Sequence, residues 1–428
     1  MIERTIEAAL KDLAGKLPVV TVTGPRQSGK TTLCRKAFPD MAYVNLERPD
    51  TREYAVTDPR GFMRTYSQGA ILDEIQRAPH LLSYIQVLVD ESAPARPFIL
   101  TGSQQFEVLN TVTQSLAGRT AFLRLLPLSI AELASHERTD DLDRLLLYGF
   151  YPRIYDRKLD PTQTLGDYFA TYVERDMRQM AAIKDLQLFE KFVKLCAGRI
   201  GQILNLQSLG NDAGVSHTTA RAWLSLLEAS YVVFVLFPWY RNISKRLVKS
   251  PKLYFYDVGL ASYLLGIENE SHVSRHPLRG NLFENLVVIE ALKYRFNRGK
   301  RSNLTFYRDG KGNEVDLVLE IGPDVFPIEI KAGATITPDY FKGLKSFEKV
   351  VTAAAGDRRV EQALPADGGG ASATSDGDSR AGAGRLSVTV GSGLIYGGSE
   401  KQTRGNTKIY PFYAIEEMLA EVTSSRGL

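Results

Sequence analysis

A glycine-rich run near the start of the chain has the residue types that bind phosphate groups. Gly24-Pro25-Arg26-Gln27-Ser28-Gly29-Lys30-Thr31 fits the pattern G-x-x-x-x-G-K-[ST] and directly follows the apolar run 19–23. In such a loop, backbone N–H groups surround phosphate oxygens, the lysine reaches the β- and γ-phosphates, and the hydroxyl ligates Mg²⁺. We therefore predict a phosphate-binding loop. Its predicted nucleotide-binding residues are Gly24, Pro25, Arg26, Gln27, Ser28, Gly29, Lys30, Thr31 and Thr32.

Two acidic residues after another apolar run would complete this site. Asp73 and Glu74 directly follow Ala70-Ile71-Leu72. A phosphate-binding loop needs a second carboxylate for the metal and a group that orients the attacking water. We predict that Asp73 holds Mg²⁺ together with Thr31, and that Glu74 polarises the water. Acidic residues after a strand are also common helix caps, so the prediction of a metal and water site at this pair depends on the presence of the phosphate-binding loop.

Two further residues are candidates for sensing the γ-phosphate. Ser103 follows the apolar run 98–100, and we predict that its hydroxyl faces that phosphate. Arg119 is predicted to be an arginine finger, in cis or on a neighbouring subunit, because a guanidinium neutralises charge on the γ-phosphate. A surface salt bridge is the alternative for Arg119. The sequence has no Asn-Lys-x-Asp motif for guanine, so ATP with Mg²⁺ is the predicted ligand.

The segments around these residues alternate between strand and helix patterns. Strands are predicted at 19–23, 43–46, 70–72 and 97–100, and helices at 2–17, 30–36 and 81–89. This alternation indicates an α/β fold with a parallel sheet. From about residue 145 to 265 the pattern is mostly helical. There, 206–214 and 217–228 predict a helix-turn-helix, with 231–237 and 252–256 as the strands of a wing.

Three residues in the C-terminal part suggest a second site. Asp316 lies in a predicted strand at 315–319, and Glu329 and Lys331 share one face of the next strand because they are two residues apart. Two carboxylates and a lysine are what a metal-dependent phosphodiesterase needs, the acids for Mg²⁺ or Mn²⁺ and the lysine for the water or the developing charge. A catalytically silent fold with the same residues is the alternative.

This arrangement resembles the restriction-endonuclease-like superfamily. The resemblance implies that Glu284, on an apolar face of the predicted helix 281–296, is a third metal ligand. Further strands are predicted at 304–307, 325–330, 386–390 and 394–396, which makes this region an α/β module. Residues 353–385 are rich in Ala and Gly and predict a flexible insertion. The predicted domains are 1–140, 141–270 and 271–428.

Several motifs together resemble a prokaryotic AAA-type ATPase family whose C-terminal half is a domain of unknown function. They are the loop 24–32 and the segments 72–79, 101–103, 115–119, 126–129, 148–152 and 245–255. The resemblance covers nearly the whole chain outside the insertion. It implies ATP binding and an AAA-type parallel sheet, followed by a winged-helix region and an α/β module, and it implies no established biological role.

Basic residues and aromatic residues are interleaved in the second half of the chain. Lys252 closes one basic segment, 241–252, and Lys293 begins another, 293–311. Nearby aromatic side chains would suit base stacking beside phosphate contacts, which makes DNA a predicted partner. The aromatic residues are Trp239, Tyr240, Tyr254, Tyr256 and Tyr307. On the predicted second helix of the helix-turn-helix, Ser216, His217, Thr218 and Arg221 are expected to face outward. Protein contacts are the alternative for these surfaces.

Composition limits the class of protein. The chain has 428 residues, which suggests about three domains, and a net charge of +4 that is too small to indicate a polyanion partner by itself. Cys34 and Cys196 have no metal-ligand spacing. The N-terminus lacks the apolar stretch of a signal peptide, and the apolar run 231–237 is too short to span a bilayer. We expect a cytoplasmic protein without a membrane partner; whether it forms a homo-oligomer stays open.

Two interpretations result. In the first, an ATPase couples its nucleotide state to DNA engagement by winged-helix and nuclease-like modules. In the second, the chain is an ATP-dependent regulatory switch or assembly protein with a catalytically silent nuclease-like fold. A small-molecule kinase is disfavoured because no compact acceptor-binding lid is evident.

Overall fold

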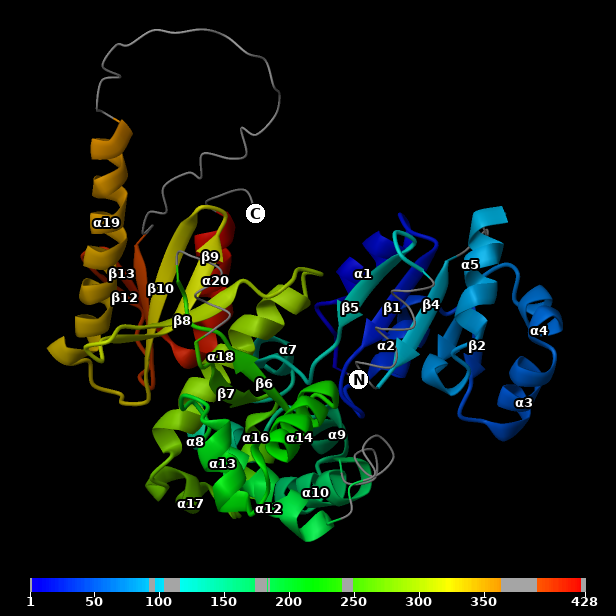
Figure 1. Ribbon diagram of the computed structural model, residues 1–428, viewed down its shortest axis with the longest axis horizontal. Helices are drawn as coiled ribbons and strands as arrows, with labels where there is room; N and C mark the ends of the chain where they lie inside the picture. Colours follow the sequence, from blue (N-terminus) through cyan, green and yellow to red (C-terminus); the bar gives the residue numbers. More distant parts are fainter. Residues whose placement is uncertain are drawn as a thin grey trace, which may run out of the picture. The chain divides into compact units, whose positions relative to one another are not determined.

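The computed structural model describes residues 2–91, 97–103, 116–173, 183, 185–240, 249–362 and 391–424. Contacts divide the chain into two compact units. The first unit is formed by Met1–Val235 and Ser250–Ser302, and the second by Leu236–Lys249 and Asn303–Leu428. Each unit has one large sheet (Figure 1). In the described part of the chain, no helix is long and apolar enough to cross a membrane.

The first unit contains the predicted parallel sheet. Its strands are β1 Val19–Thr23, β2 Ala42–Asn45, β3 Ala70–Asp73, β4 Phe98–Gly102 and β5 Thr120–Arg124, in the order β2-β3-β4-β1-β5. The pairs of neighbouring strands are all parallel. All residues of β1 and β4 are buried, as is typical of inner strands in a parallel sheet that is covered on both faces. The prediction of a parallel α/β fold is confirmed.

Helices cover both faces of this sheet. They are α1 Glu7–Ala14, α2 Lys30–Ala37, α3 Pro49–Thr57, α4 Pro59–Thr65 and α5 Leu81–Glu91, with a 3₁₀ turn η1 Ile75–Arg77. Leu10 and Leu33 from α1 and α2 pack on one face, and Phe62 and Ile85 from α4 and α5 pack on the other. Helix α1 is shorter than the predicted 2–17; before it, the Thr5 N–H donates to the Glu132 carboxylate and the Arg4 side chain donates to the Ser28 carbonyl oxygen.

The rest of the first unit is mostly helical, as predicted. Its elements are α7 Ile130–Leu133, α8 Leu142–Tyr148, α9 Pro152–Arg157, α10 Pro161–Tyr168, η2 Phe169–Val173, α12 Leu186–Ala197, α13 Leu206–Ala213, α14 His217–Ala229, β6 Val233–Leu236, β7 Lys252–Phe255, α16 Val258–Leu264, α17 Glu270–Arg275 and α18 Arg279–Phe296. Strands β6 and β7 pair with each other. The side chains of Asn205 and Ser216 cap α13 and α14. Between these helices Gly214, with φ +86°, takes the left-handed conformation that ends α13.

Helix α18 belongs to the first unit, whereas the sequence predicts it as part of the C-terminal domain 271–428. The Asn285 amide exchanges two hydrogen bonds with the backbone of Phe255, of 2.7 and 3.1 Å. Glu290 accepts a hydrogen bond of 2.8 Å from the Ile130 backbone. These buried polar contacts fix α18 to β7 and α7, and sequence periodicity alone could not show them.

The second unit has a mixed sheet in the order β12-β13-β11-β10-β9-β8. Its elements are β8 Leu304–Arg308, β9 Glu314–Ile321, β10 Asp324–Lys331, η3 Pro338–Phe341, α19 Lys342–Gln362, β11 Ser392–Tyr396, β12 Gln402–Arg404, β13 Thr407–Pro411, η4 Phe412–Ala414 and α20 Ile415–Ser424. Leu344 and Phe347 of α19 pack against Val315 and Val318 of β9.

The predicted flexible insertion differs from the structure at its start. Helix α19 continues to Gln362, so 353–362 are helical. The rest of the predicted insertion and the predicted strand 386–390 lie outside the described residues.

Candidate functional site

The glycine-rich loop lies between β1 and α2, where the sequence places it. At Gly24, with φ +149°, an added Cβ would stand 2.0 Å from the Leu125 carbonyl oxygen, so only glycine fits beside the chain there. Gly29, with φ +93°, immediately precedes the first residue of α2. The loop therefore leads into a helix N-terminus, whose unpaired N–H groups and dipole favour an anion.

Lys30 is buried at the base of this loop. Its ammonium donates to the carbonyl oxygens of Gly24, at 2.9 Å, and Pro25, at 2.8 Å. Burial lowers the pKa of Lys30, while the nearby carboxylates of Glu74 and Asp73 oppose that change. The cation is thus held within the loop that would enclose a phosphate.

Asp73 and Thr31 are brought together across 42 positions of sequence. The Thr31 hydroxyl lies 3.0 Å from both carboxylate oxygens of Asp73. Tyr43 donates a hydrogen bond of 2.8 Å to the same carboxylate, and the Thr101 hydroxyl donates another. Burial and this contact with Asp73 raise the pKa of Tyr43. Tyr43 and Thr101 were missed by the sequence analysis, since nothing near either residue in sequence marks a contact with Asp73.

Glu74 stands beside Asp73 in a strained backbone conformation. Its φ of +58° and ψ of +51° are left-handed, which is uncommon for a residue with a side chain. Ser103 donates a hydrogen bond of 3.2 Å to the Glu74 carboxylate, and Gln76, also missed from sequence, donates to it as well. The structure therefore places Glu74 and Ser103 together at the carboxyl ends of β3 and β4. Left-handed residues of this kind cluster at functional sites.

Arg119 lies at the amino ends of the parallel strands, opposite to the carboxyl ends where the loop lies. It precedes β5, whose first residue Thr120 pairs with Val19, whereas the loop follows Thr23 at the other end of β1. At 3.3 Å per residue these ends are about 13 Å apart. The Arg119 guanidinium is bonded to Asp90 at 2.8 Å. The cis role predicted for Arg119 does not fit this position, and a role in trans stays a prediction.

A cavity of about 560 Å³ opens beside the loop. Lys30, Thr31 and Glu74 line it from the sheet side, and Arg153 and Arg157 of α9 also line it. These two arginines were not singled out from the sequence, although the motif 148–152 directly precedes them. Six cationic side chains line this cavity, which suits a polyphosphate; they are Arg4, Arg26, Lys30, Lys36, Arg153 and Arg157.

The side chains present fit a magnesium nucleotide. Ser28 Oγ is buried, and within the described part of the chain it has no hydrogen-bond partner, so it has capacity for a ligand. Hydroxyl and carboxylate oxygens, as on Thr31 and Asp73, are ligands that Mg²⁺ prefers. The described residues contain no group of three or more acidic, His or Cys side chains arranged for a metal. Mg²⁺ usually completes its shell with water and substrate phosphates.

The three C-terminal candidates meet in the second unit. Lys331 Nζ lies 2.7 Å from Glu329 Oε1 and 3.5 Å from Asp316 Oδ2. Glu329 Oε2 is buried without a hydrogen-bond partner in the described structure. Burial, and then the charge of Asp316, raises the pKa of Glu329 to about 8, whereas the two acids raise the pKa of Lys331. Lys331 thus supplies one positive charge beside two carboxylates.

Glu284 has other partners in the first unit. Its carboxylate accepts hydrogen bonds from Lys252 Nζ, at 2.8 Å, and from the Tyr254 hydroxyl, at 2.6 Å. Lys252 and Tyr254 of β7 therefore provide partners for this carboxylate. A metal-binding role for Glu284 together with Asp316 and Glu329 stays a prediction without support from these contacts.

Six of the residues expected to contact DNA are buried, whereas others of the two basic segments, Lys249, Arg298, Arg301, Arg308 and Lys311, are exposed. Lys252 and Lys293 are 2% and 1% exposed and bond to Glu284 and Glu290, so neither is a surface cation. Trp239 and Tyr307 lie in the core of the second unit. The buried positions also include Tyr254 and Tyr256. For these six buried side chains the expected contact with DNA is wrong, because a mixture of basic and aromatic residues in a sequence does not distinguish a binding surface from a packed core. The segment 241–248 lies outside the described residues.

Comparisons with known proteins agree with the first site. A family model described as an AAA domain matches residues 16–134. Two domains of unknown function, DUF8612 and DUF4143, match residues 139–271 and 279–366. The uncharacterized proteins Mb2031c of Mycobacterium bovis and Rv2008c of Mycobacterium tuberculosis are each 32% identical over 352 residues, which cover 81% of this chain and 77% of theirs.

Among solved structures, the chain is similar to the Walker-type ATPase PABY2304 of Pyrococcus abyssi and to AMPPCP-bound DnaA from Aquifex aeolicus. The first has a TM-score of 0.44 and 12% identity, over 60% of this chain and 94% of that one. The second has a TM-score of 0.29 and 17% identity, over 52% and 85%.

The parallel sheet, the phosphate-binding loop and the AAA-domain match define residues 16–134, within the first unit, as a P-loop ATPase domain of the AAA type. The chain belongs to the same family as the mycobacterial proteins Mb2031c and Rv2008c.

Proposed function

We propose that the chain hydrolyses ATP and that its nucleotide state controls the second unit. The observation that carries the ATPase proposal is the joint placement of Thr31, Asp73 and Glu74 beside one cavity. A phosphate-binding loop that only bound nucleotide would not need a strained carboxylate next to the metal ligand.

Each residue has a defined task in this proposal. Lys30 and the loop N–H groups hold the β- and γ-phosphates, and Thr31 and Asp73 would hold Mg²⁺, which neutralises phosphate charge when bound. Glu74 orients a water and takes its proton as the oxygen attacks the γ-phosphorus. The bond to the bridging oxygen breaks, and ADP leaves. Ser103 holds the Glu74 carboxylate in place through the 3.2 Å hydrogen bond.

Two variants separate binding from hydrolysis. Lys30→Ala is expected to abolish ATP binding, whereas Glu74→Gln is expected to bind ATP but to lose at least about a hundredfold in kcat, the scale of a general base. Calorimetric titration with ATP and phosphate release report the two steps. Lys16→Ala, which removes an exposed lysine paired with Asp12, is the control. Unchanged ATP affinity in Lys30→Ala would contradict the site assignment.

A second activity is proposed for the second unit because Glu329 Oε2 is buried without a partner beside Asp316 and Lys331. In this proposal the unit has a restriction-endonuclease-like fold. Asp316 and Glu329 would hold Mg²⁺ or Mn²⁺, and Lys331 would orient the water that attacks a DNA phosphodiester. The helices α13 and α14 with β6 and β7 would form a winged helix. The exposed Thr218 and Arg221 on α14 support that part of the proposal.

Cleavage assays test this second proposal. Supercoiled, linear and single-stranded DNA would be incubated with Mg²⁺ or Mn²⁺, with and without ATP. We expect cleavage that is lost in both Asp316→Ala and Lys331→Ala and that changes with nucleotide. Binding of ATP without cleavage in any condition would favour the alternative, a regulatory switch or assembly protein whose second unit is catalytically silent.

A further inference from the structure

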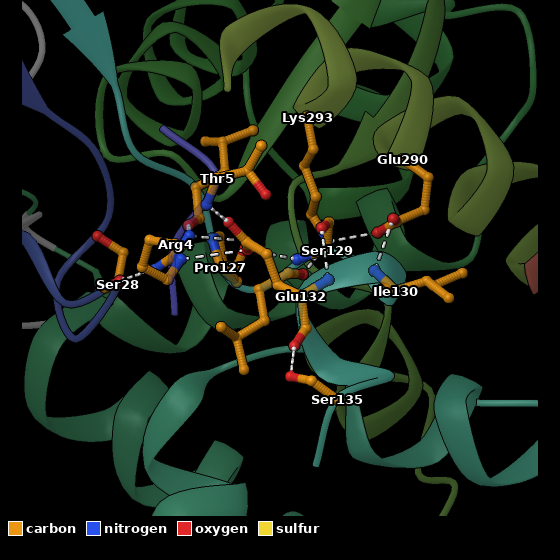
Figure 2. Close-up of polar contacts among 12 residues, drawn as sticks. Arg4, Thr5, Ser28, Pro127, Ser129, Ile130, Glu132, Ser135, Glu290 and Lys293 are labelled. Carbon is orange, nitrogen blue, oxygen red and sulfur yellow. Dashed lines mark hydrogen bonds and ion pairs between the residues drawn. The ribbon is translucent and has the colours of Figure 1, made fainter. Parts of the chain in front are cut away.

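An arginine from outside the phosphate-binding loop donates a hydrogen bond to a backbone carbonyl of that loop. Arg4 precedes α1, and its side chain is 8% exposed. Figure 2 shows its guanidinium among backbone carbonyls and the carboxylate of Glu132. Nη1 donates a hydrogen bond of 2.7 Å to the Ser28 carbonyl oxygen, and Nη2 donates one of 2.6 Å to the Leu126 carbonyl oxygen. One side chain thus connects the loop, the segment after β5 and α7.

The carboxylate of Glu132 fixes the guanidinium in this position. Glu132 Oε2 accepts from Arg4 Nε at 3.1 Å and from the Ser129 backbone at 2.9 Å, and Oε1 accepts from the Thr5 backbone at 2.7 Å. Ser129 in turn accepts from the Glu132 backbone, which completes a capping box for α7. With three backbone and side-chain donors on a buried carboxylate, Arg4 has a single defined orientation.

The hydrogen bond to the Ser28 carbonyl oxygen also determines the direction in which the N–H group of Gly29 points. In a trans peptide, the carbonyl oxygen of one residue and the N–H of the next point in opposite directions. When Arg4 holds the Ser28 oxygen, the N–H of Gly29 must face away from Arg4. A guanidinium on the oxygen also polarises the amide, which makes its N–H a stronger donor. Gly29 directly precedes Lys30 at the N-terminus of α2, where the phosphate is expected.

We propose that Arg4 is a positioning residue for nucleotide binding, which orients the Ser28–Gly29 peptide so that the Gly29 N–H donates to a phosphate of ATP. The proposal rests on the proposed ATP binding. Arg4 also lines the 560 Å³ cavity together with the loop.

Titration of ATP into the full chain tests this role with Arg4→Met, Arg4→Lys and the exposed control Lys16→Ala. A hydrogen bond to a charged group is typically worth enough for about a tenfold to hundredfold change in affinity. We expect that loss in Arg4→Met, a smaller loss of about threefold to tenfold in Arg4→Lys, which keeps the positive charge but on a single nitrogen, and no change in Lys16→Ala. Should Arg4→Met fail to fold, the loss in Arg4→Lys decides.

Hydrogen exchange without nucleotide provides the readout that general destabilisation would not reproduce. Amides of the loop 24–32 are expected to exchange faster in both Arg4 variants, while those of α5 keep the wild-type rate. ATP affinity within about twofold of wild type in each folded Arg4 variant would overturn the inference. Failure of the wild-type chain to bind ATP would instead overturn the proposed function, and the exchange experiment would still show whether Arg4 orders the loop.

Discussion

Glu228, on α14, is a single residue whose environment should make stability depend on pH. Burial raises its pKa from 4.5 to about 7. Between these values the unfolded chain has lost a proton that the folded chain keeps. The contribution of Glu228 to the free energy of unfolding therefore falls as the pH rises from about 4.5 to 7, and then levels off. Glu228→Gln removes this ionisation, so we expect the variant to exceed wild type by about 1–3 kcal/mol at pH 8 and to equal it near pH 4.

Urea unfolding at several pH values measures this difference. Glu190→Gln, on the exposed partner of Lys194 in α12, is the control and should give a difference that hardly changes with pH. A stability difference for Glu228→Gln that is the same at pH 4 and pH 8 would contradict the prediction.

Also at the scale of residues, the sequence predicted the functional side chains that belong to a short contiguous motif. Lys30 and Thr31 follow from the loop pattern, and Asp73 follows from its place after a strand. The roles of Arg4 and Tyr43 could not be predicted, because no sequence motif links Arg4 to Ser28 or Tyr43 to Asp73. Partners of this kind are set by tertiary packing, which a single sequence does not display.

At the scale of elements, α18 shows why charge in a sequence is easily misread. The helix is buried on nearly all sides, so Lys293 does not reach solvent. Its ammonium lies 2.7 Å from Glu290 Oε1 and 2.7 Å from the Leu128 carbonyl oxygen, and 4.0 Å from the centre of the Phe150 ring. The boundaries of α13, α14 and β1 were predicted closely, because caps and apolar runs are local. The docking of α18 depends on contacts 160 residues apart.

Lys293→Ala is expected to lower the free energy of unfolding by about 3–5 kcal/mol, because it leaves the buried carboxylate of Glu290 without its cation. Chemical denaturation followed by circular dichroism measures the change. Lys194→Ala removes a lysine from an exposed pair on α12 and should cost less than about 1 kcal/mol. A loss below about 1 kcal/mol in Lys293→Ala would mean that the pair contributes little to the fold.

At the scale of the whole molecule, the question is whether the two units respond to nucleotide together. The chain has two tryptophans, Trp223 in α14 of the first unit and Trp239 in the core of the second. Trp239→Phe leaves a fluorescence probe in the first unit, and Trp223→Phe leaves one in the second. Their urea transitions report the stability of each unit separately.

Mg·ATP at a hundred times its Kd should stabilise the Trp223 transition by about 2.7 kcal/mol, because the ligand binds the folded first unit alone. Both single-tryptophan chains carry Glu74→Gln in this experiment, so that ATP is not consumed. If nucleotide state controls the second unit, as proposed, the Trp239 transition must also shift, by the coupling free energy of about 1–3 kcal/mol. Lys30→Ala should abolish both shifts. A Trp239 transition that stays fixed while the Trp223 transition moves would contradict the coupling, since any control of Asp316 and Glu329 by ATP requires a free-energy difference in the unit that contains them.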